Sequence, residues 1–158
     1  MTKPVENGHI MSNSDSLVET VVVGLPWASA STTFSILDVL SSVGRDWEML
    51  HGAPARTPRF KARLLSLDGS RYQDPNGRWI TPEGALQDTP EPGLIIVPDL
   101  HLDPHAPAPK TFDPIARWIR HAHGHGALTA SVCSGALLLA ETGLLDGIEA
   151  TTHWAYSD

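Results

Sequence analysis

The chain has 158 residues, which is enough for one domain with a sizeable core. Its 11 lysines and arginines stand against 18 aspartates and glutamates, for a formal net charge of -7. An acidic surface repels phosphate backbones, so we expect no direct DNA binding by this chain. No apolar run approaches the roughly 20 residues that span a bilayer, and one cysteine excludes an internal disulfide. These features indicate a cytoplasmic protein without a membrane partner.

Two parts of very different composition follow each other along the chain. Residues 1–17 are polar and lack the apolar core of a signal peptide, so we expect a disordered N-terminus. Residues 18–158 alternate short apolar runs with amphipathic ones. They are expected to form the single folded domain.

The folded part reads as strands that alternate with helices. Short apolar or β-branched runs predict strands, and these are 18–25, 46–52, 61–67, 78–81, 93–100, 127–133 and 148–152. Apolar residues at helical spacing, with caps and glycine stops, predict helices at 32–44, 111–126 and 134–143. Such alternation predicts an α/β fold with a mostly parallel sheet covered by helices on both faces.

Cys133 stands where a predicted strand passes directly into a helix. A nucleophile on such a sharp turn is exposed above the sheet, and the turn requires small neighbours such as Gly135. The free N–H groups of the next helix favour a thiolate, and the N–H of Ser134 is a candidate oxyanion donor. The alternative is a small buried structural cysteine.

His153 follows the last predicted strand, 148–152, and strand ends of a parallel sheet share one edge. Cys133 and His153 are therefore expected to meet. A Cys–His pair is the minimum for activated thiol chemistry.

The segment SVCSGALLLAETGLLDGIEATTHW resembles the ThiJ/PfpI superfamily, the class I glutamine amidotransferase-like fold. It looks most like the amidase-like sensor domain of GlxA-type, AraC-family transcriptional regulators, in which Cys133 and His153 match the cysteine and histidine of the motif. The resemblance covers residues 18–158 and implies a flavodoxin-like three-layer sandwich, a homodimer and a small-molecule effector or substrate. It implies no cofactor.

Two departures from the superfamily pattern concern catalysis. Enzymes of the superfamily place an Asp or Glu after the first strand, where this chain has Thr32. The strand that normally ends in Pro-Gly-Gly ends in Pro98, Asp99 and Leu100. The N–H groups of Asp99 and Leu100 remain candidate oxyanion donors, but the glycine conformation is less accessible.

A third departure is length, because the resemblance implies further strands, a helix and a helix-turn-helix pair after residue 158. We therefore expect a C-terminally truncated sensor domain, without the DNA-binding part, rather than an enzyme. Two other readings stay open. One is a stand-alone cysteine hydrolase or hydratase with Cys133 as nucleophile and His153 as acid and base. The other is a redox-sensing thiol.

No metal site is expected from the histidines of HAHGH. His121, His123 and His125 are spaced by two residues, and side chains two apart on a helix do not face each other. Histidines at the C-terminal end of a helix are explained by its dipole.

Overall fold

The centre of the fold is β1, Val18–Val23, a run rich in valine whose last four residues are buried. The computed structural model describes residues 17–52, 54 and 58–156. Of the N-terminus predicted to be disordered, only Leu17 falls within this range. In β1, consecutive residues are buried rather than alternate ones, which is typical of a strand with helices on both faces of its sheet.

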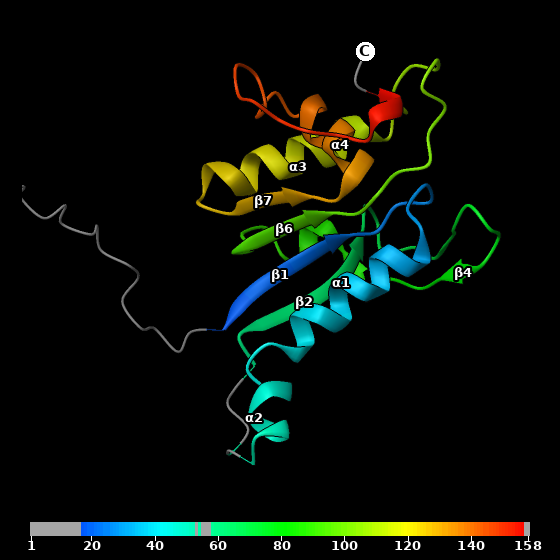
Figure 1. Ribbon diagram of the computed structural model, residues 1–158. Coiled ribbons are helices and arrows are strands. Elements are labelled where there is room, and N and C mark those ends of the chain that lie inside the picture. The colour runs from blue at the N-terminus through cyan, green and yellow to red at the C-terminus, as the bar shows by residue number, and fades with distance from the viewer. Residues whose placement is uncertain (1–16, 53, 55–57, 157–158) are drawn as a thin grey trace, which may run out of the picture.

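Five strands form one sheet, in the order β5-β2-β1-β6-β7 (Figure 1). The four strands besides β1 are β2 (Phe60–Ser66), β5 (Gly84–Ala85), β6 (Leu94–Val97) and β7 (Leu128–Ser131). Every neighbouring pair is parallel, and Val22 of β1 lies between Leu64 and Ile96. A separate antiparallel pair, β3 (Tyr72–Gln73) and β4 (Trp79–Ile80), forms a hairpin beside it.

The strand order determines where a ligand site is expected. From β1 the chain moves outward to β2, and it returns later to β6 on the other side of β1. Ligands of open α/β sheets bind at this reversal, outside the carboxyl ends of the strands. The reversal lies between β1 and β6, so it directs attention to the loops that follow these strands.

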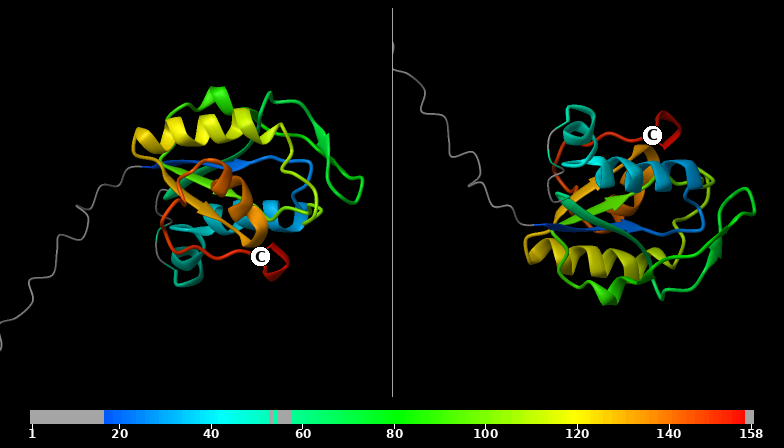
Figure 2. Two further views of the ribbon diagram at one scale, coloured as in Figure 1. Left: turned by 90° about the horizontal axis from the view of Figure 1, so that it is seen from above. Right: turned by 90° about the horizontal axis from the view of Figure 1, so that it is seen from below.

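The sheet is the middle of three layers. Helix α1 (Ala30–Ser42) covers one face, with α2 (Asp46–Leu50) after it, and α3 (Phe112–Gly124) covers the other face (Figure 2). Helix α4 (Ala136–Glu141) packs beside α3. These layers confirm the predicted flavodoxin-like α/β sandwich and its three helices.

The two faces are packed very differently. On the α3 face a large core joins strand residues to helix residues, among them Val23, Ile95, Phe112, Ile119 and Leu138. On the α1 face the buried cluster consists, among the described residues, of Val22, Leu64 and Ile80, and Val39 of α1 is 64% exposed. Most of the apolar burial that stabilises this fold therefore comes from the α3 face.

The strand predicted at 46–52 was wrong. Residues Asp46–Leu50 form α2, whose first turn carries Asp46 and Glu48, where carboxylates favour a helix. The apolar residues Trp47, Met49 and Leu50 are exposed instead of filling a sheet. The strand that follows β1 along the chain is β2 instead, and it pairs with every residue of β1.

The strand predicted at 148–152 was also wrong. These residues have irregular backbone and are mostly exposed, and a single helical turn, η3 (Trp154–Tyr156), follows them. They do not pair with β7. The segment is held instead by Tyr156, whose hydroxyl donates to the Leu102 carbonyl at 2.7 Å. His153 therefore reaches its place from an irregular segment.

Within the part of the chain that the structure describes, no helix combines the length and the apolar character needed to cross a bilayer.

Candidate functional site

Three loops meet at the carboxyl ends of the central strands, where the fold predicts a site. One follows β1 and leads through Trp27 to Ser29 at the start of α1. The second follows β6, from Pro98 to His101. The third is the short turn from β7 into α4, which carries Cys133.

Cys133 has a strained backbone. Its φ is +53°, and among the described residues it is the non-glycine residue with positive φ. A side chain in this left-handed region costs on the order of 1–3 kcal/mol, and such strain persists only where the surroundings enforce it. The thiol is exposed, which excludes the alternative of a buried structural cysteine.

Close packing behind the turn enforces this conformation. A Cβ on Gly135 would collide with the Pro98 carbonyl oxygen and lie 2.6 Å from that of Val97. The expected need for a small residue at this position is therefore confirmed. The chain at Gly135 is pressed against the end of β6, while Cys133, two residues earlier, is exposed.

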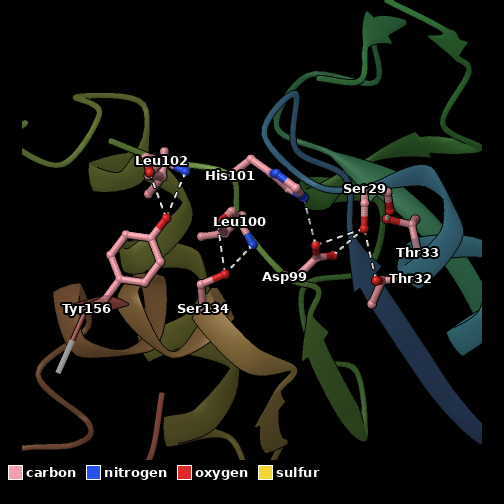
Figure 3. A network of polar contacts seen from close by, with 9 residues as sticks. All are labelled: Ser29, Thr32, Thr33, Asp99, Leu100, His101, Leu102, Ser134 and Tyr156. Atoms are coloured by element: carbon pink, nitrogen blue, oxygen red, sulfur yellow. Dashed lines mark hydrogen bonds and ion pairs between the residues drawn. The ribbon is translucent and has the colours of Figure 1, made fainter. Parts of the chain in front are cut away.

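Ser134 fastens the same turn to the loop after β6 (Figure 3). Its buried hydroxyl donates to the Leu100 carbonyl and accepts from the Leu100 N–H, both at 2.8 Å. The Leu100 N–H, one of three predicted oxyanion donors, is thus engaged within the protein. The N–H groups of Ser134 and Asp99 remain the candidate donors.

Cys133 and His153 line the same cavity. The cavity has a volume of about 320 Å³, and its lining residues are Asp99, Leu100, His101, Cys133, Ser134, His153 and Tyr156. The His153 Nδ1 accepts from the Ala155 N–H at 3.2 Å, so Nε2 is the nitrogen left for a ligand.

A carboxylate that sequence reasoning missed also belongs to this cavity. Asp99 reaches from the loop after β6 to the start of α1, where the Ser29 hydroxyl lies 2.7 and 2.8 Å from its two oxygens (Figure 3). Ser29 Oγ is in turn 2.9 Å from Thr32 Oγ1. A carboxylate thus lies near Thr32, but it comes from the loop after β6 and not from the first helix. The signal in the sequence was Asp99 itself, in the place of a glycine.

His101 completes the polar group around Asp99. Its Nε2 is 3.2 Å from Asp99 Oδ2, and its side chain is 60% exposed, against 17% for that of Asp99. His101 therefore lies at the mouth of the cavity, with the carboxylate deeper inside.

A second cavity, of about 410 Å³, adjoins the first and shares His101 and Tyr156 with it. Its wall includes Trp27, which packs edge-to-face on Phe112 with ring centroids 5.7 Å apart, and the proline-rich loop 103–109. Among the described residues of this wall, the acidic ones are Asp103 and Glu141. The two adjoining cavities together are called the double cavity below.

Tyr72 lies on the other side of the loop after β1, in a smaller cavity that also includes Trp27. Burial raises the pKa of its phenol to about 12, and the charge of Asp74 acts in the same direction, while a hydrogen bond with the backbone of Leu25 opposes them. Tyr72 therefore stays neutral over the ordinary pH range.

This chain is therefore an α/β protein with a flavodoxin-like sheet. A strained, exposed cysteine lies between β7 and α4, at the carboxyl edge of that sheet. Residues 45–158 match the model of the DJ-1/PfpI family. The chain belongs to this family, which confirms the resemblance found in the sequence.

Two curated relatives differ in what their names describe. The chain is 29% identical over 99 residues to the HTH-type transcriptional regulator CdhR of Pseudomonas aeruginosa, covering 63% of this chain and 28% of the regulator. It is 32% identical over 105 residues to an isonitrile hydratase of Pseudomonas putida, covering 66% of this chain and 44% of the hydratase. The chain thus spans less than half the length of either relative.

Among solved structures, an AraC family transcriptional regulator from Pseudomonas putida is similar, with a TM-score of 0.67 at 21% identity. The similarity covers 89% of this chain and 69% of that one. At this identity the likeness concerns the fold.

Proposed function

We propose that this chain is the amidase-like ligand-sensing domain of an AraC-type transcriptional regulator, and that a small molecule binds in the double cavity. The observation that carries the proposal is that Cys133, His153 and Asp99 line one cavity that opens beside a second, largely apolar one. The similarity to CdhR supports the regulator class. DNA recognition would belong to a helix-turn-helix domain outside these residues.

The charges in the walls favour a small cationic ligand. Asp99, Asp103 and Glu141 line the double cavity, and these carboxylates attract a positive group. Trp27 adds an aromatic ring in the same wall, and the ring face of a tryptophan attracts cations. We therefore infer that the effector carries an amine or a quaternary ammonium group.

Binding is tested by titrating the protein with small amines and quaternary ammonium compounds while the tryptophan fluorescence is followed. Ala140 is exposed and lines the larger cavity, so Ala140→Phe should fill it and abolish the response. The matched control is Ala130→Phe, an exposed position on β7 outside both cavities. Equal binding by both variants would place the ligand elsewhere.

A second candidate function, an isonitrile hydratase, is favoured by the relative of that name and by the Asp99 carboxylate. The Cys133 sulfur would add to the isonitrile carbon while a proton is delivered to form a thioimidate. Water would then attack that carbon, and the C–S bond would break to release an N-substituted formamide and the thiol. His153 and Asp99 are the groups in the cavity able to move the protons.

The two functions are separated by incubating the protein with tert-butyl isonitrile and measuring the formamide by NMR. A sensor should form no more formamide than its Cys133→Ser variant does. Turnover that the variant lacks would establish the hydratase instead. An in-frame helix-turn-helix downstream of codon 158 in the gene would support the regulator independently.

The proposed regulator domain is further expected to form a homodimer. Sedimentation equilibrium measures this directly, and a monomer at all concentrations would contradict it.

A further inference from the structure

Two histidines and one glutamate gather at the end of the molecule opposite Cys133. Glu91 precedes β6, and His121 and His125 lie at the C-terminal end of α3. Each offers one ligand atom, and the three atoms lie within 4.8 Å of one another. The structure thus unites a pair four residues apart on a helix with a carboxylate from a loop thirty residues earlier.

The geometry points to a binding site for Zn²⁺, or a similar first-row divalent metal, formed by Glu91, His121 and His125. Two imidazoles and a carboxylate are a ligand set that zinc takes in proteins, with a fourth position left for water. Residues four apart lie on the same side of a helix, and the rings of His121 and His125 are 4.3 Å apart between centroids.

The orientation of His125 suits this role. Its Nδ1 is 2.8 Å from the His121 carbonyl oxygen, which fixes the ring and directs Nε2 outward. A ligand histidine that donates its second ring nitrogen to a backbone carbonyl is the arrangement that metal sites commonly use. Here this hydrogen bond is already present.

The backbones that carry the three ligands are firmly held. Ile119 and Ala122 of α3 are fully buried in the core. Glu91 stands between two prolines, and Gly93, two residues further on, donates to Glu19 O at 2.8 Å and accepts from Leu128 N at 3.0 Å. Pro fixes the backbone on both sides of the carboxylate.

Only the side chains need to move for a metal to bind. Ligands about 2.0–2.2 Å from a tetrahedral metal lie about 3.4 Å apart, so atoms that lie within 4.8 Å of one another need to approach by no more than about 1.4 Å. All three side chains are exposed, and rotation of exposed side chains is fast and inexpensive. Binding would then join the end of α3 to the loop before β6.

The test is Zn²⁺ titration of the untagged protein, by calorimetry and thermal unfolding. A Cys133→Ser background removes the cysteine sulfur as a competing ligand. One Zn²⁺ should bind and raise the unfolding temperature. Removal of a ligand by His121→Ala, His125→Ala or Glu91→Gln should weaken binding by about tenfold or more.

The matched control is His123→Ala, on the same helix. The His123 Nδ1 is 3.1 Å from the Ala127 carbonyl oxygen, and this residue does not belong to the cluster. Its variant should bind Zn²⁺ as tightly as the background protein. Absence of binding would overturn the proposal, as would binding that His121→Ala and His125→Ala leave unchanged or that His123→Ala weakens equally.

Discussion

The two ends of the sheet carry polar clusters that are built in opposite ways. At the carboxyl end, Cys133 is held in a strained conformation by a buried glycine contact and by the paired hydrogen bonds of Ser134. At the amino end, Glu91, His121 and His125 are exposed side chains on a firm backbone. The first site is assembled without a ligand and stores strain, whereas the second needs a metal to bring its atoms together. The difference separates a preorganised site from one that a ligand completes.

The largest expected effect is that of Gly135→Ala at the carboxyl end. The new Cβ would overlap the Pro98 carbonyl and press on that of Val97, so the free energy of unfolding should fall by about 2–3 kcal/mol. The control, Gly124→Ala near the amino end, adds a Cβ with nothing within 4 Å and should be neutral or slightly stabilising. Urea unfolding measures both. Equal stabilities would show that the turn is not closely packed.

Ser134→Ala should be next in size. It leaves the Leu100 N–H and carbonyl without their partner in a buried place, at a cost of about 1–3 kcal/mol. The half-buried Ser42, whose hydroxyl makes a solvent-exposed hydrogen bond to the Val39 carbonyl, is the control, and Ser42→Ala should change stability by less than about 0.5 kcal/mol. A loss as small as that at Ser42 would mean that Ser134 does not fasten the two loops.

Cys133→Gly should stabilise the protein. Glycine adopts positive φ without a Cβ penalty, so relief of the strain should raise the free energy of unfolding by about 1 kcal/mol. Cys133→Ala keeps the strain and should remain close to the parent protein. If the two variants are equally stable, the backbone at Cys133 is not strained.

A further expected effect concerns pH. The pKa of Tyr72 is about 12 in the folded protein, above the value near 10 of an unfolded tyrosine. Because the folded state holds this proton more tightly, the stabilisation is complete below about pH 10 and is lost as the pH rises towards 12. Tyr72→Phe should show a shallower fall in stability over that interval. An identical pH profile for parent and variant would contradict the assigned burial.

The fold could be predicted from the sequence because its signals are local. The valines of β1 and the spacing of apolar residues in α1 and α3 specify their elements before any tertiary contact forms. The segment 46–52 was wrongly predicted as a strand because hydrophobicity was its only strand-like feature. In the structure it forms α2, and its apolar residues are exposed. Residues 148–152 would form a strand only if they paired with the edge of β7. Such pairing is a tertiary contact, which the local sequence does not show.

The site could be predicted only in part. Cys133, Gly135 and His153 stand in one motif, and the structure brings Cys133 and His153 to one cavity. The role of the Asp99 carboxylate was missed because a carboxylate was expected on α1, whereas this one reaches the start of α1 from the loop after β6. The histidines were compared at a spacing of two, although His121 and His125 are also four apart, and only the fold brings Glu91 beside them.

The most direct measurement is a thermal unfolding screen of small amines and quaternary ammonium compounds, on the native protein and on protein carboxamidomethylated at Cys133. Because the thiol is exposed in the cavity, iodoacetamide should modify it and fill part of the 320 Å³ space. The account predicts at least one compound that raises the unfolding temperature of the native protein and fails on the modified one. If no compound stabilises the native protein, or if both forms respond alike, the proposed ligand site at Cys133 is contradicted.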